Sequence, residues 1–339
     1  MFASDTARNR LLAVLTFLLT VAALRESYPV TMPMAFALVV IAAVWPLKPW
    51  LDRFLPSGAS YALTVLALLA LLAGFAAAVY FAAAQVVRAL TVHWPALEAA
   101  YNEAAAWAAR HGLPLGGRVS GARVSGAIQL AVAGLYNAAA YLGFVAVLVI
   151  LGLPEVPGFR RKLRDELDSD ARREAVTAIV TIAGKVRAYF GVTLATSVLT
   201  GAATAGFTWA MGVELSLTWG VLNFLLNFIP VIGNLIGIVP PTIYALAQFG
   251  GWTTPLLVFA GLGVIQLAIS NFIYPLLQGR SLALSPVAIV VALAFWSWVW
   301  GIAGALIAVP LTAAAAIACE HFPSTRWIAK LLAKPEKKD

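Results

Sequence analysis

The chain alternates between long apolar stretches and short polar segments. No Asp, Glu, Lys or Arg occurs between Arg53 and Arg88, or between Arg187 and Glu214. A helix needs about 20 apolar residues to cross the hydrocarbon core of a bilayer, so stretches of this length are typical of transmembrane helices. The apolar segments that we expect to form helices cover residues 11–24, 28–45, 61–87, 130–153, 188–211, 215–249, 254–277 and 284–318. The pattern therefore predicts an all-α, polytopic helical membrane protein with about eight apolar segments.

The first of these segments is short. It has 14 residues between Arg10 and Arg25, and the hydrophobic core of a signal peptide has a similar length. No clean small-x-small cleavage site follows it. We therefore interpret it as a span whose flanking arginines snorkel to the membrane surface.

Two of the segments, at 215–249 and 284–318, are too long for a single crossing. A straight helix of their 35 residues is about 52 Å long, whereas the hydrocarbon core is about 30 Å thick. Their sequences also resemble each other, since GNLIGIVP occupies residues 233–240 and GALIAVP occupies residues 304–310. Each segment follows one ordinary span, which indicates an internal repeat.

Both long segments carry residues that interrupt a helix. Pro230 and Gly233 break the first segment, and Gly301 and Gly304 break the second. Broken apolar segments at matching positions are the best sequence indication of a transporter's binding site, because freed backbone groups survive at membrane depth only beside protein or water. A simpler interpretation is that these glycines only allow close helix packing.

Two topologies are compatible with these breaks. In the first, each long segment is a re-entrant hairpin, and the two hairpins enter from opposite sides as an inverted repeat. In the second, each segment crosses once as a kinked helix, which gives parallel repeats and places Arg280 outside. We favour the hairpins because they use the excess length and leave Arg280 in the cytoplasm.

Composition and charge support the membrane class and orient the chain. Hydrophobic residues make up 62% of the 339 residues and charged residues 11%, which excludes an ordinary soluble domain. The net charge of +8 does not indicate nucleic-acid binding, because basic residues concentrate in the cytoplasmic loops of membrane proteins. With the N-terminus in the cytoplasm, 18 of the 23 lysines and arginines lie on the cytoplasmic side. We therefore expect both termini to be cytoplasmic.

The spacing of spans and charges divides the chain into regions. Residues 1–158 are expected to form a scaffold that also supports oligomerisation, with an outer-face insert at 88–123 whose helix begins at Trp94-Pro95. The other expected regions are a cytoplasmic amphipathic helix at 159–187, a transport core at 188–320 and a basic cytoplasmic tail at 321–339. The scaffold would hold the core in place while the core moves.

The sequence carries none of the motifs that we would expect of an enzyme. It has no Walker loop, no GxGxxG and no HExxH, so it indicates neither an ATPase nor a hydrolase. Cys319 is the only cysteine, and the three histidines show no metal-ligand spacing. We expect no catalytic residues, no metal and no cofactor.

Several motifs resemble those of the autoinducer-2 exporter family, also called PerM-like permeases. They are VWPLKPWLDR at 44–53, YFG at 189–191, NFIPVIG at 227–233, NFIYPLLQG at 271–279 with LSP at 284–286, and WGIAGALIAVP at 300–310. The resemblance covers nearly the whole chain. It implies a multi-pass transporter of the bacterial inner membrane that forms homo-oligomers, with a pentamer as one arrangement. Some members are linked to export of the furanone signal autoinducer-2, and others are described as sodium(lithium)/proton antiporters.

Neutral polar side chains lie next to the breaks, and polar groups inside a membrane are costly and often functional. The residues that we expect to line the substrate pathway are Asn227, Pro230, Gly233, Asn234, Gly237, Gln266, Asn271, Pro275, Gln278, Arg280, Gly301, Gly304 and Pro310. Their amides suit a small hydroxylated solute, whereas the simpler interpretation is hydrogen bonding between helices. Arg280 could attract an anion or anchor a loop at the membrane surface.

These features favour a secondary or passive exporter of small polar solutes, such as a furanone-type signal, that works by alternating access of the transport core within the lipid bilayer. Cation or proton antiport needs carboxylates or histidines among the helices. Between residues 188 and 318 the one candidate is Glu214, which we expect in a surface loop. A sodium(lithium)/proton antiporter is therefore the second hypothesis, and a membrane scaffold that transports nothing is the third.

Overall fold

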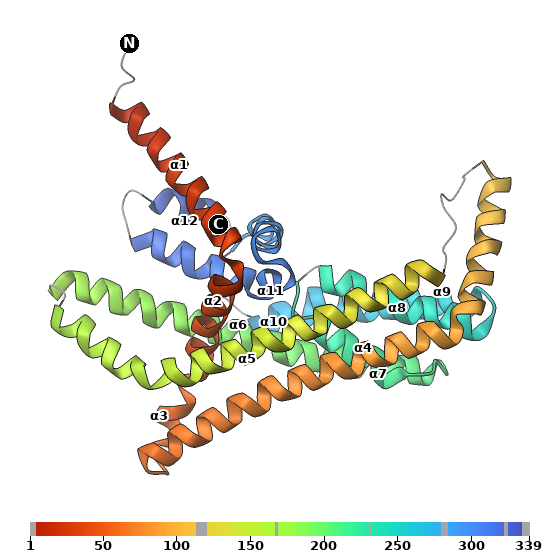
Figure 1. The fold of residues 1–339 in the computed structure, drawn as a ribbon, viewed down its shortest axis with the longest axis horizontal. Helices are drawn as coiled ribbons and strands as arrows, with labels where there is room; N and C mark the ends of the chain where they lie inside the picture. Colours follow the sequence, from red (N-terminus) through yellow and green to blue (C-terminus); the bar gives the residue numbers. More distant parts are fainter. Residues whose placement is uncertain are drawn as a thin grey trace. The chain divides into compact units, whose positions relative to one another are not determined.

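Helices make up the fold of the described chain. The computed structural model describes residues 5–112, 121–166, 169–230, 232–278, 284–321 and 325–333. Their elements, in chain order, are α1 (Asp5–Glu26), α2 (Tyr28–Val44), α3 (Leu47–Leu51), α4 (Ser57–Arg110), α5 (Gly121–Glu166), α6 (Ser169–Ala210), α7 (Ser216–Leu226), α8 (Ile232–Phe249), α9 (Thr253–Ala268), the π-helix η1 (Ile269–Ile273), α10 (Tyr274–Gln278), α11 (Pro286–His321) and α12 (Arg326–Leu332) (Figure 1). The predicted all-α class is confirmed.

Seven helices of the described residues are long and apolar enough to cross a membrane. They are Tyr28–Leu51, Ser57–Ala89, Ala140–Phe159, Val176–Ala210, Ile232–Phe249, Thr253–Leu277 and Pro286–Glu320. Each overlaps an apolar segment that the sequence predicts, so the prediction of a polytopic helical membrane protein is confirmed. Helix α1 is formed but is not one of the seven, and its apolar run between Arg10 and Arg25 has 14 residues.

Three helices are much longer than a membrane crossing requires. Helix α4 has 54 residues, α5 has 46 and α6 has 42, whereas about 20 residues cross the hydrocarbon core. Their ends must therefore extend beyond it. Helix α4 continues into the insert expected at 88–123, as far as residue 110. The single helix expected at 159–187 is instead divided between the end of α5 and the start of α6. Residues 113–120 and 167–168 lie outside the described residues.

The sequence indicated that a separate helix begins at Trp94-Pro95. This prediction is wrong, because Pro95 lies inside α4. A proline inside a helix removes one backbone hydrogen bond and bends the helix, but the turns on either side can remain intact. Figure 1 shows the gold C-terminal part of α4 turned away from the direction of the preceding part. The insert expected at 88–123 is therefore attached, as far as residue 110, to a membrane helix without a loop between them.

The chain packs into two compact units. The first unit contains residues 1–65, 141–187 and 282–339, and the second unit contains residues 66–140 and 188–281. The transport core expected at 188–320 is shared between them, because α11 belongs to the first unit. Units defined by packing need not coincide with regions defined by function, so the functional regions stay predictions.

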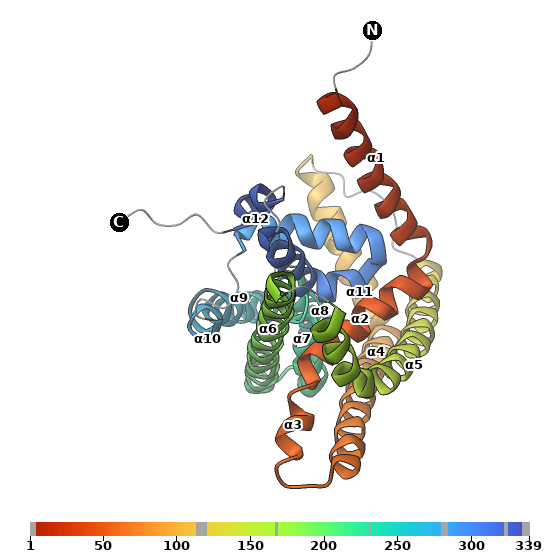
Figure 2. The ribbon, with the colours of Figure 1, turned by 90° about the vertical axis from the view of Figure 1, so that its left-hand side faces the viewer.

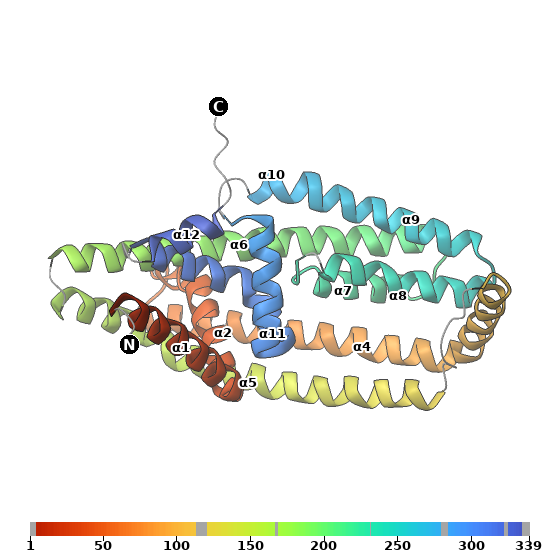
Figure 3. The ribbon, with the colours of Figure 1, turned by 90° about the horizontal axis from the view of Figure 1, so that it is seen from above.

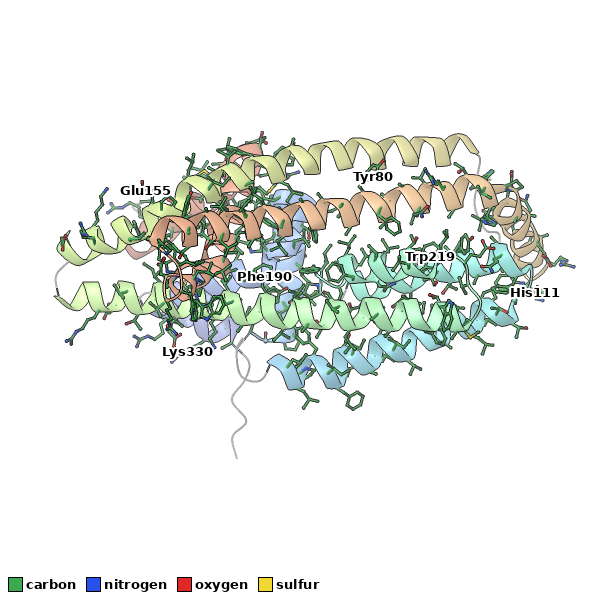
Figure 4. The ribbon with its side chains drawn as sticks, turned by 90° about the horizontal axis from the view of Figure 1, so that it is seen from below. Tyr80, His111, Glu155, Phe190, Trp219 and Lys330 are labelled. Carbon is green, nitrogen blue, oxygen red and sulfur yellow. The ribbon has the colours of Figure 1, made fainter. Side chains whose placement is uncertain are left out.

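The apolar core of the second unit lies where α7, α8 and α9 meet. Figure 3 shows these three helices side by side with the second half of α6. The buried residues of this core are Ala89, Val213, Trp219, Ile238, Tyr244, Ala245, Val258 and Leu262. Trp219, which is labelled in Figure 4, is 2% exposed and is one of the largest buried side chains. The packing of α7 against α8 therefore depends on a bulky aromatic side chain.

The predicted span at 254–277 contains a π-helix. Helix α9 ends at Ala268, and η1 occupies Ile269–Ile273 before α10 begins at Tyr274. Pro275 gives the reason, because it has no N–H for the bond of an α turn and its ring clashes with the preceding turn. The wider π turn relieves this clash, and such turns are frequent at functional sites.

In the first unit, α11 packs against α1, α2 and α12. The Trp300 indole donates a hydrogen bond to the Leu24 carbonyl at 3.2 Å. The Arg25 guanidinium lies 4.4 Å from the centre of the Trp298 ring, which is the geometry of a cation–π contact. The arginine that we expected to snorkel thus contacts an aromatic ring of its own unit.

The motif at 44–53 forms the turn around α3, also in the first unit. The Lys48 amine donates hydrogen bonds to the Asp52 carboxylate at 2.9 Å and to the Ser57 hydroxyl at 3.2 Å. The hydrogen bond from Lys48 lowers the pKa of Asp52, because it stabilises the ionised carboxylate. These bonds join α3 to the first turn of α4.

Candidate functional site

The first long apolar segment folds as two antiparallel helices, α7 and α8. The rings of Trp219 and Tyr244 are 5.3 Å apart, and the Asn223 side chain donates a hydrogen bond to the Gly237 carbonyl at 2.9 Å. Later residues of α7 therefore contact earlier residues of α8, which is the order expected of antiparallel helices. Helix α7 has 11 residues and is about 16 Å long, which is too short to cross the hydrocarbon core. The break that the sequence predicts at Pro230 is confirmed.

Gly233 allows the backbones of α7 and α8 to approach each other at this break. A Cβ atom at this position would overlap the carbonyl oxygen of Leu226. A side chain at Gly237 would likewise overlap the Asn223 side chain. Close helix packing, the simpler interpretation of these glycines, is therefore observed at both positions, and their place on a substrate pathway stays a prediction.

Asn223 holds the two helices together, and the sequence-based prediction missed it. Its side chain is 4% exposed, and its amide nitrogen donates to the carbonyls of Trp219 and Gly237. In an unbroken helix the Gly237 carbonyl would accept from the N–H of residue 241, but that residue is Pro241. Asn223 supplies the missing donor. The sequence contains both parts of this arrangement. Pro241 follows Gly237 by four residues, and Asn223 precedes Asn227 by four residues, about one helical turn.

The second long apolar segment is also broken, within α11. Trp300 has φ −128° and Gly301 has φ 63° with ψ −145°, a combination that only glycine adopts readily. After the break the second arm folds back, because the Trp296 indole donates a hydrogen bond to the Thr312 hydroxyl at 3.0 Å (Figure 2). A Cβ atom at Gly304 would overlap the Trp296 carbonyl oxygen. The break predicted at Gly301 and Gly304 is confirmed.

The two breaks share one local arrangement. The sequence repeat aligns Gly233 with Gly304, and each glycine lies against a backbone carbonyl of the helix before it. These carbonyls belong to Leu226 at the end of α7 and to Trp296 in the first arm of α11. The internal repeat in the sequence therefore corresponds to the same close approach of backbone to backbone in each unit.

The two asparagines that flank the first break bond to different neighbours. The Asn227 amide donates to Ser197 Oγ at 3.0 Å and to Thr196 Oγ1 at 3.3 Å. The Asn234 amide donates to Ser270 Oγ at 2.8 Å. The break is therefore connected to α6 on one side and to η1 on the other. Sequence reasoning missed these hydroxyl partners, although serine and threonine recur at helical spacing along α6.

Asn271 and Gln266 do not join the amides at this break. Asn271 is exposed, and its side chain donates to the Leu267 carbonyl of its own helix at 3.0 Å. Gln266 is buried on α9, at 7% exposure. The structure thus brings together Asn227 and Asn234 with hydroxyls, and leaves Asn271 apart from them.

The remaining predicted residues are spread over both units. Pro275 is exposed in α10, and Gln278 is the last residue of that helix. Gly301, Gly304 and Pro310 belong to α11 in the first unit, where Pro310 is buried. Arg280 lies outside the described residues, so its cytoplasmic location stays a prediction.

A second polar cluster lies near the C-terminal end of α8. The Tyr244 hydroxyl donates to the Glu214 carboxylate at 2.9 Å and lies 3.1 Å from Nε2 of His93. Glu214 is exposed in the loop between α6 and α7, where we expected it. Gln248 joins this loop to α8 by bonds to the Glu214 N–H and the Gly212 carbonyl, both 2.9 Å long. Sequence reasoning missed His93 because 151 residues separate it from Tyr244.

Replacing Tyr244 with phenylalanine is expected to lower the thermal midpoint of the purified protein by about 2–4 °C. The substitution keeps the ring that packs on Trp219 and removes the hydroxyl that joins His93 to Glu214, a bond worth about 1 kcal/mol. Tyr80→Phe is the control, because Tyr80 is exposed on α4 (Figure 4). Equal midpoints for Tyr244→Phe and the control would contradict a stabilising role for the hydroxyl.

Comparisons with known proteins agree on one family. The sequence matches the family model described as AI-2E family transporter over residues 11–324. The AI-2 transport protein TqsA of Escherichia coli (strain K12) is 34% identical over 203 residues, which are 60% of this chain and 58% of that protein. A protein of Haemophilus influenzae named only as a candidate transport protein is 34% identical over 197 residues, 57% of this chain and 56% of that protein. Another from Mycobacterium tuberculosis is 28% identical over 310 residues, 84% of this chain and 80% of that protein.

The alignments with the first two relatives cover less than two-thirds of the length of those proteins. The family match, in contrast, covers nearly the whole chain, and it agrees with the seven helices that can cross a membrane. The resemblance to autoinducer-2 exporters that the motifs indicate is thereby confirmed. The chain is a multi-pass membrane protein that belongs to the AI-2E family of transporters.

Proposed function

We propose that this protein exports a small polar solute across the bacterial inner membrane, with both of its termini in the cytoplasm. A furanone-type signal is the first candidate for the solute, because the E. coli relative at 34% identity is named as an AI-2 transport protein. The distribution of lysine and arginine supports the orientation, since 18 of 23 lie on the cytoplasmic side in this arrangement.

One observation carries the proposal. At the break between α7 and α8, the amides of Asn227 and Asn234 bond to hydroxyl groups of α6 and η1 inside an apolar unit. Ligand sites are mostly apolar with a few placed polar groups, and transporter sites lie beside broken helices. Because these groups are all neutral, they suit an uncharged solute that can exchange hydrogen bonds with them.

The broken segments suggest how access could alternate. We infer that α7–α8 and the two arms of α11 are re-entrant hairpins that reach towards the middle of the membrane from opposite sides. Helix α7, with 11 residues, is too short to cross the hydrocarbon core. The backbone at its break would be stable where it lines a water-filled cavity. Rigid motion of the hairpins against the long helices would then open the solute site to one side at a time.

Solute flux in proteoliposomes tests the proposal. Asn227→Leu and Asn234→Leu each remove a side chain with hydrogen-bonding atoms at the break, and we expect each to lower the initial rate of furanone flux about tenfold, the effect of about 1.4 kcal/mol. Asn271→Leu is the matched control, since Asn271 is exposed and bonds within its own helix. Its flux should stay within about twofold of wild type.

Two results would contradict the proposed function. One is the absence of flux in the wild-type protein for furanones and neutral sugars, with and without an imposed pH gradient. The other is equal flux in Asn227→Leu, Asn234→Leu and Asn271→Leu. The break between α7 and α8 would then contribute no more to solute flux than an exposed position on η1.

A further inference from the structure

We propose that one face of α6 in the second unit is the wall against which the transported solute binds, and that this solute is uncharged and carries hydroxyl groups. The contacts are the side chains of Tyr189, Thr193 and Thr200 on α6 and of Asn234 on α8, which we call the open polar cluster. The inference rests on the proposed transport function and extends it by naming residues and a chemical class of solute.

Hydroxyl side chains follow this face of α6. Residues three, four, seven and eleven positions apart lie on the same side of a helix. The hydroxyl residues with this spacing, each at most 2% exposed, are Thr193, Thr196, Ser197, Thr200, Thr204 and Thr208. From Tyr189 to Thr208 the face is about 28 Å long, close to the thickness of the hydrocarbon core. A membrane helix with a polar face of this length must turn it towards other polar groups.

Some of these hydroxyls are satisfied by their own helix. Thr208 donates to the Thr204 carbonyl at 2.8 Å, and Thr196 donates to the Val192 carbonyl at 2.9 Å. Bonding back to the preceding turn is the usual arrangement for threonine inside a helix. These hydroxyls therefore need no ligand, and they provide an internal comparison for the others on the same face.

The open polar cluster differs because its polar atoms make no well-aligned hydrogen bond, although the Tyr189 and Thr193 hydroxyls lie close to each other. In the described part of the chain, the buried side-chain atoms without a hydrogen bond are Tyr189 Oη, Thr193 Oγ1, Thr200 Oγ1 and Asn234 Oδ1. Buried polar groups in native proteins are almost always paired, because an unpaired one loses its hydrogen bonds with water. All four atoms belong to the second unit. Three of them lie along one helix, α6, and we infer that a bound molecule supplies the missing partners.

Three of the four residues are connected through one neighbouring segment. Tyr274, the first residue of α10, lies close to both Tyr189 and Thr193. Ser270, four residues before it, accepts the bond from the Asn234 amide nitrogen and leaves the amide oxygen open. Ser270 and Tyr274 therefore connect α8 to α6, and Tyr189, Thr193 and Asn234 lie where this segment meets the two helices.

The chemistry of the cluster selects a neutral solute. Hydroxyl groups can donate or accept a hydrogen bond, and an amide oxygen accepts. Between residues 188 and 279 the one charged side chain is Glu214, which lies in the loop between α6 and α7. An ion at the cluster would have no countercharge, and a buried unpaired charge is strongly unfavourable. Hydroxyl or carbonyl groups on an uncharged solute would satisfy the open atoms within its reach. Because Tyr189 and Thr200 are about 16 Å apart along α6, one small solute would contact them at different points of its route.

Single cysteines test this proposal without knowledge of the natural solute. In full-length protein with Cys319→Ser, which removes the only native thiol, Thr193→Cys and Thr200→Cys are treated in proteoliposomes with methanethiosulfonates. We expect the uncharged hydroxyethyl reagent to modify both cysteines. Relative to a free thiol, it should react at least about tenfold faster than the anionic sulfonatoethyl and cationic trimethylammonioethyl reagents, because charge is excluded from the cluster.

Val258→Cys is the matched control. Val258 on α9 is as fully buried as Thr200, at 0% exposure, but it lies in the apolar core of the same unit. We expect it to stay unmodified. The proposal is overturned if Thr193→Cys and Thr200→Cys are as unreactive as Val258→Cys, or if charged reagents modify them as fast as the uncharged one.

A second pair of variants separates the solute site from the transport function. Thr200→Val keeps the side-chain shape and removes an open hydroxyl, so the thermal midpoint without solute should stay unchanged or rise by about 2 °C while flux falls about tenfold. Thr242→Val should keep its flux, because the Thr242 hydroxyl lies on α8, outside this face, and donates to the Ile238 carbonyl at 2.8 Å. Wild-type-like flux in Thr200→Val overturns the site but not the function, whereas reactive cysteines in a protein without any flux contradict the function alone.

Discussion

Gly233→Ala is expected to abolish solute flux and to lower the thermal midpoint of the purified protein by at least about 5 °C. The added Cβ atom would overlap the Leu226 carbonyl oxygen, which is backbone and cannot rotate away. One extra methyl group in a well-packed site costs about 1–3 kcal/mol even where side chains can adjust. Here α7 and α8 must separate, which also strains the bond from Asn223. Thermal unfolding and flux in proteoliposomes measure both effects.

Gly206→Ala is the matched control for this substitution. Gly206 lies inside α6, and nothing lies within 4 Å of the position that its Cβ atom would occupy. Alanine is favoured over glycine inside a helix by about 0.5–1 kcal/mol, so the control should be slightly more stable and should keep its flux. If Gly233→Ala behaves as Gly206→Ala does, the close approach of the two backbones is not what makes the break work.

Asn223→Leu is expected to have the second largest effect. The substitution keeps the branched shape of the side chain and removes the donor to the Gly237 carbonyl, which Pro241 leaves without its helical partner. An unsatisfied buried carbonyl costs about 1–3 kcal/mol, and no water replaces the donor inside a membrane. We expect the thermal midpoint to fall by about 5 °C and flux to fall about tenfold, because the α7–α8 pair loosens.

A second substitution should rescue this defect. Pro241→Ala returns a backbone N–H to the position that faces the Gly237 carbonyl in a regular helix. In the Asn223→Leu background we expect it to restore part of the lost stability, while alone it should have a smaller effect. The explanation is wrong if Pro241→Ala makes the double variant less stable than Asn223→Leu, as two independent destabilising changes would.

The sequence predicts those parts of the fold that depend on local chemistry. The spans follow from uncharged runs of about 20 residues. The breaks follow from glycine and proline, so Pro230, Gly233, Gly301 and Gly304 could be placed before the structure was known. The extent of the long helices could not, because α4 continues through Pro95, whose effect depends on the tertiary contacts around it.

The contacts of the candidate site depend on distances that a sequence does not contain. Asn223 is matched to the carbonyl freed by Pro241 only because α7 and α8 are antiparallel in one particular register. The His93 and Tyr244 pair joins residues 151 positions apart. Asn271 and Asn234 both carry an amide beside a break in a helix, yet Asn271 is exposed. The π turn of η1 determines which residues of that segment face inward.

Helix α6 couples two very different environments. Within the second unit it runs without a proline from Ala188 to Ala210, with the buried open hydroxyl of Thr200 near the middle and the exposed indole of Trp209 near the end. These two residues are about 13 Å apart along the helix axis. An uninterrupted stretch of helix turns as a rigid rod, so any rotation that carries the hydroxyl away from a solute swings the residue at position 209 through the same angle. A spectroscopic label at that exposed position would therefore report the state of a site buried in the unit.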